Sequence, residues 1–292
     1  MNFTYIEDLI AQAQEKNIAV GELVIQYEME SSQLSRETIW QRMQSNWQVM
    51  KASAQKGLTN QEKSASNLVG GDARKLVAYA AKSYTGSTVM RAAAYAVGIS
   101  ELNAVMGKIV ACPTAGSCGI LPAAILAAAE KNGNSEDEVI MALFAAAGVG
   151  MIIDRNASIS GAEGGCQAEC GSAAGMAAAA LVILQGGGAP VIGDAVALAL
   201  KNMLGLVCDP VAGLVEVPCV KRNGFAVVQA ILAADMSMAG IKSVIPADEV
   251  ITAMKEIGQA LPKSLKETSE GGLAVTPTAK AIEKRLYGLQ AE

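Results

Sequence analysis

The sequence predicts an all-α fold, a compact helical bundle with a buried central helix and functional loops rich in glycine and proline. Three observations lead to this prediction. Apolar residues recur with helical periodicity, no segment of useful length alternates between apolar and polar residues, and several long segments are rich in Ala, Gly and Met. Small side chains of this kind suit helices that pack at a short axial distance around a central one.

The expected helices follow from apolar faces and capping residues. Two amphipathic faces occur near the N-terminus: Ile6, Leu9, Ile10 and Ala13 for the first, and Trp40, Met43, Trp47 and Met50 for the second. A capping box from Ser135 to Glu138 opens a helix over Val139–Ile153, and Pro246 opens another that ends near Leu261. The buried helices are expected in the Ala/Gly/Met-rich segments, which are Gly119–Ala129, Gly171–Leu184 and Ala195–Leu206.

Polar residues and glycines gather in the breaks between these helices: Gly57–Asp72, Cys112–Gly119, Asp154–Gly171, Cys208–Asn223 and Thr268–Thr278. All 6 cysteines fall within these breaks, and none in the body of an expected helix. Core cysteines usually lie on apolar helix or strand faces. The placement therefore favours a chemical role for some of them.

Composition and charge exclude several classes of function. The net charge is −5 and Lys and Arg form no large cluster, so nucleic-acid binding is not expected. The N-terminus carries acidic residues where a signal peptide would carry basic ones, and the apolar runs are too short for a membrane span. We therefore expect a cytoplasmic protein that does not bind membranes, with its cysteines reduced.

Histidine is absent from the chain. A Ser-His or Cys-His nucleophile, a histidine metal ligand and a histidine base are thus excluded, and any metal must be bound by thiolates or carboxylates. The cysteines contain no C-x2-C motif, and their spacings are Cys112-x5-Cys118, Cys166-x3-Cys170 and Cys208-x10-Cys219. Such dispersed ligands suit an iron–sulfur or zinc site formed by a folded domain, and buried structural thiols are the alternative.

Three segments resemble the alpha chain of the bacterial iron–sulfur-dependent L-serine dehydratases: AVMGKIVACPTAGSCGILPA, GAEGGCQAECGSAAGMAAAALV and LGLVCDPVAGLVEVPCVKRN. GGLAVTPTAK near the C-terminus fits as well, and the resemblance covers most of the chain from about Gly57 onward. It implies a carbon–oxygen lyase that converts L-serine to pyruvate and ammonia without pyridoxal phosphate. We expect one helical catalytic domain over residues 1–292, with an N-terminal helical segment at 1–56 and the cluster- and substrate-binding core at 57–292.

The resemblance also implies a [4Fe–4S] cluster held by three cysteines, which fall here on Cys166, Cys208 and Cys219. Three protein ligands leave one iron open, and that iron can act as a Lewis acid on the β-hydroxyl of serine. The glycines around Cys166 would let the backbone close around the cluster. Three cysteines have no expected ligand role. Cys170 is expected to be a neighbouring structural thiol and Cys118 to shape its loop. No role is assigned to Cys112.

Substrate contacts are expected in the turn formed by Thr114, Ala115, Gly116 and Ser117. Its hydroxyl and N–H groups precede a helix N-terminus, which favours a carboxylate. From the residues alone an ordinary helix N-cap explains this turn equally well. The resemblance favours substrate binding.

A cation for the substrate carboxylate is expected near Cys219, where Lys221, Arg222 and Asn223 follow in sequence. We take Lys221 as the candidate, and an exposed basic turn is the alternative. Asp72 can reach the site or cap the next helix. For Lys75, in that helix, a role at the site also stays open.

A partner chain is also implied. Members of the family either fuse two regions in one chain or divide them between an alpha and a beta chain, and this chain resembles the divided type. Such beta chains bring a loop rich in Ser and His. We therefore expect the catalytic base from a beta chain, with Lys221 as the possible base here, and little activity from the alpha chain alone.

Three other functions compete with this one. A related iron–sulfur L-cysteine desulfidase would use the same cluster and release sulfide. A pyridoxal-phosphate enzyme would need a phosphate cradle, but a helix C-cap followed by Pro190 explains Gln185–Gly188 more simply. A non-catalytic helical scaffold subunit would leave the cysteines as structural thiols.

Overall fold

The computed structural model describes residues 3–288, and the regular structure in that range is helical, which confirms the all-α prediction. An isolated β-bridge joins Cys208 and Lys266. The α-helices are α1 (Ile6–Glu15), α2 (Val20–Ser32), α3 (Arg36–Thr59), α4 (Asp72–Tyr79), α5 (Gly86–Ala104), α6 (Ile120–Asn132), α7 (Glu136–Asn156), α8 (Gly161–Gly164), α9 (Ser172–Leu184), α10 (Ala189–Lys201), α11 (Cys219–Met238), α12 (Ala247–Ala260) and α13 (Pro277–Tyr287).

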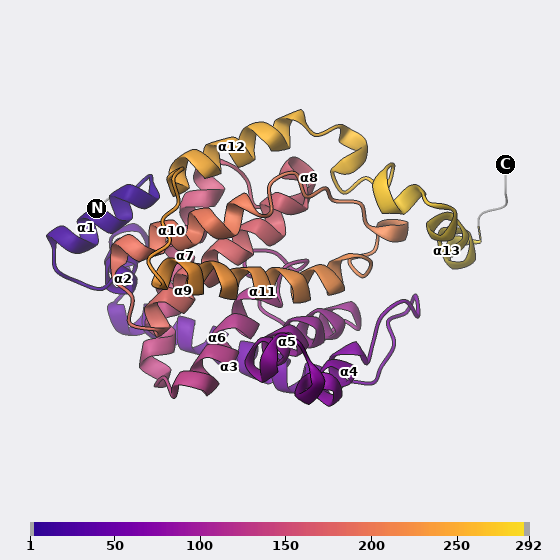
Figure 1. Cartoon of the computed structure of the whole chain (residues 1–292), viewed down its shortest axis with the longest axis horizontal. Helices are drawn as coiled ribbons and strands as arrows, with labels where there is room; N and C mark the ends of the chain where they lie inside the picture. Colours follow the sequence, from indigo (N-terminus) through magenta and orange to yellow (C-terminus); the bar gives the residue numbers. More distant parts are fainter. Residues whose placement is uncertain (1–2, 289–292) are drawn as a thin grey trace.

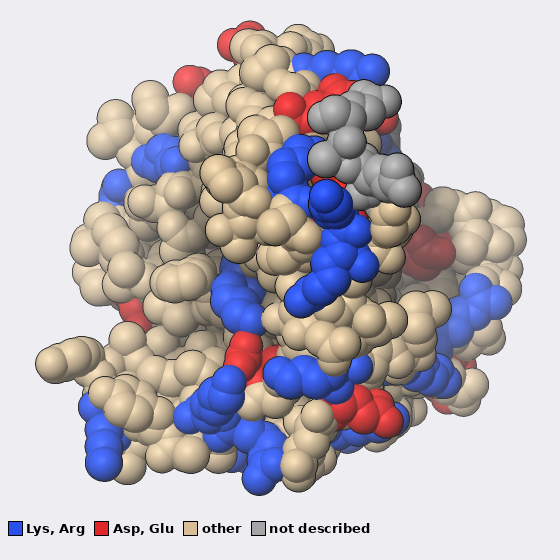
Figure 2. All heavy atoms as spheres, turned by 90° about the vertical axis from the view of Figure 1, so that its right-hand side faces the viewer, with Lys and Arg blue, Asp and Glu red and all other residues tan. Residues whose placement is uncertain are grey.

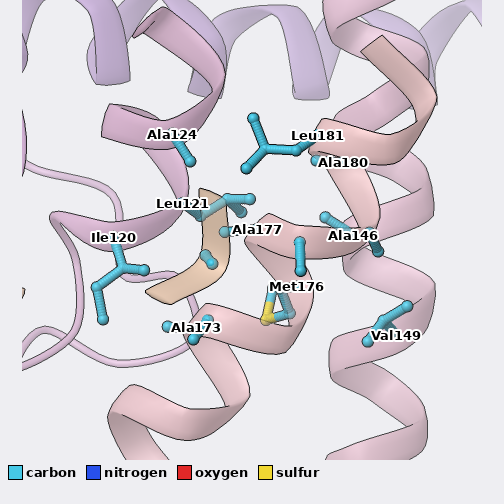
Figure 3. Close-up of a cluster of buried hydrophobic side chains, with 14 of the residues drawn as sticks. Ile120, Leu121, Ala124, Ala146, Val149, Ala173, Met176, Ala177, Ala180 and Leu181 are labelled. Carbon is cyan, nitrogen blue, oxygen red and sulfur yellow. The ribbon is translucent and has the colours of Figure 1, made fainter. Parts of the chain in front are cut away.

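Helix α9 is the buried centre of the bundle, as the sequence predicts. It packs against α6, α7, α10 and α11, and Ile183 is its only residue that is not buried. Figure 3 shows the side chains that line these contacts: Ala173, Met176, Ala177, Ala180 and Leu181 of α9, with Ile120, Leu121 and Ala124 of α6 and Ala146 and Val149 of α7. The window Gln167–Leu184 has the length and hydropathy of a membrane span, but 89% of it is buried inside the protein, as expected for a core helix.

Helix α7 begins where the capping box predicts. The side chain of Ser135 accepts the N–H of Glu138, and the Glu138 carboxylate accepts the N–H of Ser135. Helix α12 starts after Pro246 and ends at Ala260, again as predicted. After α9 the chain turns at Gly186, whose φ of 77° suits glycine, and Pro190 lies in the first turn of α10.

The predicted helix Ala195–Leu206 is wrong at both ends. Helix α10 runs from Ala189 to Lys201. Pro190 starts it earlier, because a proline in the first turn loses no helical hydrogen bond. The chain leaves the helix after Lys201 and reaches Gly205, whose φ is 82°.

The prediction that no cysteine lies in a helix is also wrong. Cys219 is the first residue of α11, because the N–H of Arg222 already bonds to the carbonyl of Pro218. Cys170 lies in a π-helical turn, Gln167–Gly171, that leads into α9. The breaks are correspondingly shorter than predicted, and Asp154–Gly171 holds the end of α7, all of α8 and this turn. Single π-helical turns of this kind often occur at functional sites.

The loop before α11, which carries Cys208, and the start of α11, which is Cys219, lie at the end of the bundle from which α13 projects (Figure 1). There Ala279 of α13 packs on Val211 and Ala212 of the loop before α11. Figure 2 views this end and shows Lys and Arg side chains gathered over it. A chain with a net charge of −5 thus presents a basic face around these loops.

Helices α3 and α5 touch through their backbones at Gly57 and Gly98. A Cβ on Gly57 would lie 2.5 Å from the carbonyl oxygen of Gly98, and a Cβ on Gly98 would lie 2.8 Å from the carbonyl carbon of Gly57. Neither position has room for a side chain unless the two helices separate.

We expect Gly57→Ala or Gly98→Ala to lower the free energy of unfolding by about 2–3 kcal/mol, because overpacking a close helix contact costs about that much. Urea unfolding followed by circular dichroism measures the change. Gly175→Ala in α9 is the matched control, since its Cβ would meet side-chain carbons at 3.6 Å, an ordinary contact. Equal losses in all three variants would contradict this account of the α3–α5 contact.

Candidate metal centre

The structure brings together the three cysteines that the resemblance implies as ligands. Cys166 precedes the π-helical turn, Cys208 lies in the loop after α10 and Cys219 starts α11. Their exposed fractions are 2%, 3% and 7%. Burial raises the pKa of Cys219 to about 12 and also raises the pKa of Cys208, and negative charge on Cys166 adds to both shifts. Cys166 therefore acts electrostatically on the other two buried thiols.

Cys170 lies next to Cys166. The two Sγ atoms are 3.3 Å apart and share a hydrogen bond. That hydrogen bond lowers the pKa of Cys166 and raises the pKa of Cys170. The positive charge of Arg222 also lowers the pKa of Cys166. Cys166 is therefore the thiol at this site that ionises most readily.

Arg222 is the cation that faces the cysteines. It donates to the carbonyl of Val207 at 2.8 Å and to Oδ1 of Asp209 at 2.9 Å, and it also contacts Cys166. The other carboxylate oxygen of Asp209 accepts the N–H of Leu273 at 2.8 Å. Arg222 thus connects two of the candidate ligand loops through buried polar contacts.

Lys221, the sequence candidate, lies elsewhere. Its Nζ is 2.6 Å from Asp72, which also pairs with Lys75 at 2.7 Å. Asp72 does not cap α4 with its side chain, because the buried carboxylate of Glu101 accepts the backbone N–H groups of Gly70, Asp72 and Ala73. A role of Lys221 in substrate binding or as a base stays a prediction that these contacts do not favour.

The loop from Cys208 to Cys219 is fixed from outside by several contacts. Glu216 accepts the hydroxyls of Ser64 and Ser66, with Oγ of Ser64 at 2.6 Å. Tyr287 of α13 donates its hydroxyl to the carbonyl of Ala212 at 2.9 Å. Ser269 donates to the carbonyl of Pro210 at 2.7 Å. The segments 60–71, 266–275 and α13 therefore all hold the loop between two candidate ligands.

The turn Thr114–Ser117 stands directly before α6, where the sequence predicts it. Asn223 of α11 is fully buried and holds this turn, donating to the carbonyl of Gly116 at 2.7 Å and accepting the N–H of Gly119 at 3.0 Å. It also donates to the carbonyl of Cys219 at 2.9 Å. One amide side chain thus connects the expected substrate turn to a candidate ligand.

Two carboxylates at the site were not predicted from the sequence. Glu169, in the π-helical turn, accepts the hydroxyl of Thr114 and is 9% exposed. Glu267 lies beside Cys208, since its N–H donates to the Cys208 carbonyl at 2.9 Å. The position of Glu169 between Cys166 and Cys170 is a signal that the sequence offers. For Glu267 the sequence offers only its closeness to the GGLAVTPTAK segment.

The donor set fits an iron–sulfur cluster. The three thiols are free and buried, and the guanidinium of Arg222 lies beside Cys166, which suits a cluster held by thiolates. Within residues 3–288 no three Cys, Asp or Glu side chains close on one point in the way that a single metal ion needs. The three thiols thus agree in kind with the ligands that the resemblance implies for a cluster.

Comparisons with known proteins agree with this picture. The family described as "Serine dehydratase alpha chain" matches residues 15–274. A "Probable L-serine dehydratase, alpha chain" of Bacillus subtilis is 50% identical over 288 residues, which cover 98% of this chain and 96% of the relative. The "L-serine dehydratase, alpha chain" of Peptoniphilus asaccharolyticus is 42% identical, with 95% of this chain and 96% of the relative covered.

A third relative is longer than this chain. The "L-serine dehydratase" of Streptomyces coelicolor is 38% identical over 278 residues, which cover 92% of this chain but only 60% of that protein. Its name carries no chain designation. The family match and these identities show that this chain belongs to the serine dehydratase alpha chain family.

Proposed function

We propose that this chain is the alpha subunit of an enzyme that converts L-serine to pyruvate and ammonia, with Cys166, Cys208 and Cys219 as ligands of a [4Fe–4S] cluster. The observation that supports the proposal is the burial of these three free thiols, two of which feel the charge of Cys166, in a member of this family. A cytoplasmic setting belongs to the proposal, because free thiols persist in a reducing compartment.

Three thiolate ligands would leave one iron of the cluster open, and this iron supplies a Lewis acid for the β-hydroxyl of serine. The residues of the chain bind and orient the rest of the substrate. The turn Thr114–Ser117 offers hydroxyls and N–H groups for the carboxylate, and the N-terminus of α6 adds its partial positive charge. Arg222 stabilises negative charge on Cys166.

The proton on the α-carbon needs a base, and the chain has no histidine to supply one. Lys221 is engaged in an ion pair with Asp72. We propose that a beta chain supplies the base. The extra length of the Streptomyces coelicolor relative supports this, because a chain of this size covers only 60% of it.

The ligand assignment predicts the effect of removing single thiols. Cys208→Ser is expected to lose more than about half of the iron and sulfide that the wild-type chain binds anaerobically, because a hydroxyl replaces a thiolate ligand. Cys170→Ser is the matched control, since Cys170 is buried beside Cys166 without being a proposed ligand. Iron and sulfide analysis with the visible spectrum measures both variants. Full iron content in Cys208→Ser would contradict the assignment.

The partner assignment predicts a dependence on a second chain. The purified alpha chain, loaded with iron and sulfide, is expected to have less than about 1% of the serine dehydratase activity of the alpha–beta pair, because general base catalysis contributes about 100-fold or more. Pyruvate formation under anaerobic conditions measures this ratio. If the alpha chain alone were as active as the pair, the base would have to lie within this chain.

A further inference from the structure

L-Serine offers three polar groups to an enzyme: a hydroxyl, a carboxylate and an ammonium. The proposed function accounts for the hydroxyl and the carboxylate. The ammonium carries a full positive charge and three N–H donors. A site that binds it therefore needs hydrogen-bond acceptors, and carboxylates are the strongest acceptors in proteins. Two carboxylates at this site have no assigned role.

Glu169 connects the expected substrate turn to the cysteines. One of its oxygens, Oε1, accepts the hydroxyl of Thr114 and would lie 2.5 Å from a Cβ placed on Gly116. The other, Oε2, would lie 3.5 Å from a Cβ placed on Gly161. Its carboxylate therefore spans the distance between the turn before α6 and the start of α8.

Three polar groups converge at Gly161, which has no side chain. A Cβ there would lie 3.1 Å from Sγ of Cys208, 3.3 Å from Oε2 of Glu267 and 3.5 Å from Oε2 of Glu169. One thiol and two carboxylate oxygens thus pack closely around this residue. Sγ of Cys208 is almost completely buried, and within the described residues it forms no hydrogen bond, which suits its proposed role as a cluster ligand. The two carboxylates therefore lie beside the proposed metal centre.

Glu267 is held in position by the ligand loop itself. Its N–H donates to the carbonyl of Cys208 and its φ is 63°, in the left-handed region. Residues other than glycine adopt this conformation at a cost, and such strained residues cluster at functional sites. The residue is exposed to solvent while its carboxylate lies beside Gly161, so the carboxylate is accessible from outside.

No cation of the described chain pairs with these two carboxylates. Within residues 3–288 neither Glu169 nor Glu267 takes part in an ion pair. Arg222 interacts with Glu169 only through its charge, and its N–H groups are engaged by Val207, Asp209 and Cys166. Two carboxylates that lie near each other repel one another, and a cation from outside the chain would relieve this repulsion.

We infer that Glu169 and Glu267 bind the ammonium group of L-serine. The inference rests on the proposed function and extends it to the third polar group of the substrate. With the ammonium at Glu169 and Glu267, the carboxylate at the turn Thr114–Ser117 and the hydroxyl near Cys208, three contacts fix the orientation of the α-carbon. The same pair selects 2-amino acids against hydroxy acids that lack the amine.

The test compares two probes that each lack one group of serine. L-Alanine keeps the ammonium and has no hydroxyl, so that it cannot be dehydrated, whereas 3-hydroxypropionate keeps the hydroxyl and has no ammonium. Inhibition constants for both, and KM and kcat for L-serine, are measured on the anaerobic alpha–beta holoenzyme. The variants are Glu267→Gln and Glu169→Gln, and Glu270→Gln, an exposed carboxylate in the same segment, is the matched control.

We expect Glu267→Gln and Glu169→Gln each to raise the KM for L-serine and the inhibition constant of L-alanine about 10- to 100-fold, because each removes a charge-assisted hydrogen bond. The inhibition constant of 3-hydroxypropionate should stay within about 2-fold of the wild type. Iron content and the visible spectrum should not change, and Glu270→Gln should behave as the wild type.

Two outcomes would overturn the inference. Equal weakening of L-alanine and 3-hydroxypropionate would mean that the carboxylates maintain the shape of the site, and unchanged constants for L-alanine would mean that the ammonium binds elsewhere. Failure of the proposed function is seen separately, because a wild-type holoenzyme without iron or without serine dehydration would reveal it before any variant is compared.

Discussion

The candidate metal centre depends on the burial of three thiols at one end of a helical bundle. Cys166 enters this end just before α9, Cys208 follows α10 and Cys219 begins α11. Since α9 packs against both α10 and α11, the ends of these helices carry the cysteines to one place. The short side chains of α9 make that packing possible, because they let neighbouring helices approach closely. The alanine-rich core and the cysteine loops are therefore two parts of one arrangement, in which the core sets where the thiols meet.

Helix packing alone does not fix the loop between Cys208 and Cys219, which contains only one short helical turn, Val211–Gly213. Its order comes from polar contacts with segments that are distant in sequence. Glu216 is held by Ser64 and Ser66, and Asp209 is held by Arg222 and by the N–H of Leu273. Each of these buried acceptors is satisfied, as a stable interior requires. A loop fixed in this way can present two thiols at a constant separation, which a metal centre needs from its ligands.

The sequence predicts the helices well because periodicity and caps act locally. The capping box at Ser135 and the alanine-rich α9 depend on neighbouring residues, and both are found as expected. The different surroundings of Lys221 and Arg222 could not be read from the sequence in this way. Because α11 starts at Cys219, adjacent side chains point about 100° apart, so that Lys221 meets Asp72 while Arg222 meets Cys166. Glu169 and Glu267 were missed because their meeting at Gly161 depends on tertiary structure, which no local pattern encodes.

The candidate site gathers more negative than positive groups, which favours a ligand that carries a positive charge. Burial raises the pKa of Glu169 and of Cys208, and negative charge on Glu169 raises the pKa of Cys208 further. Arg222 is the one described cation that acts on this group, and it is held by Asp209 and Val207. A folded chain tolerates such local conflict where function requires it and stabilises it through the surrounding packing. The conflict has a consequence for specificity: a ligand that brings a positive charge relieves it, while a ligand of the same shape without that charge does not. With the ammonium group bound by Glu169 and Glu267 as inferred, discrimination between amino acids and hydroxy acids follows from electrostatics, without any steric barrier.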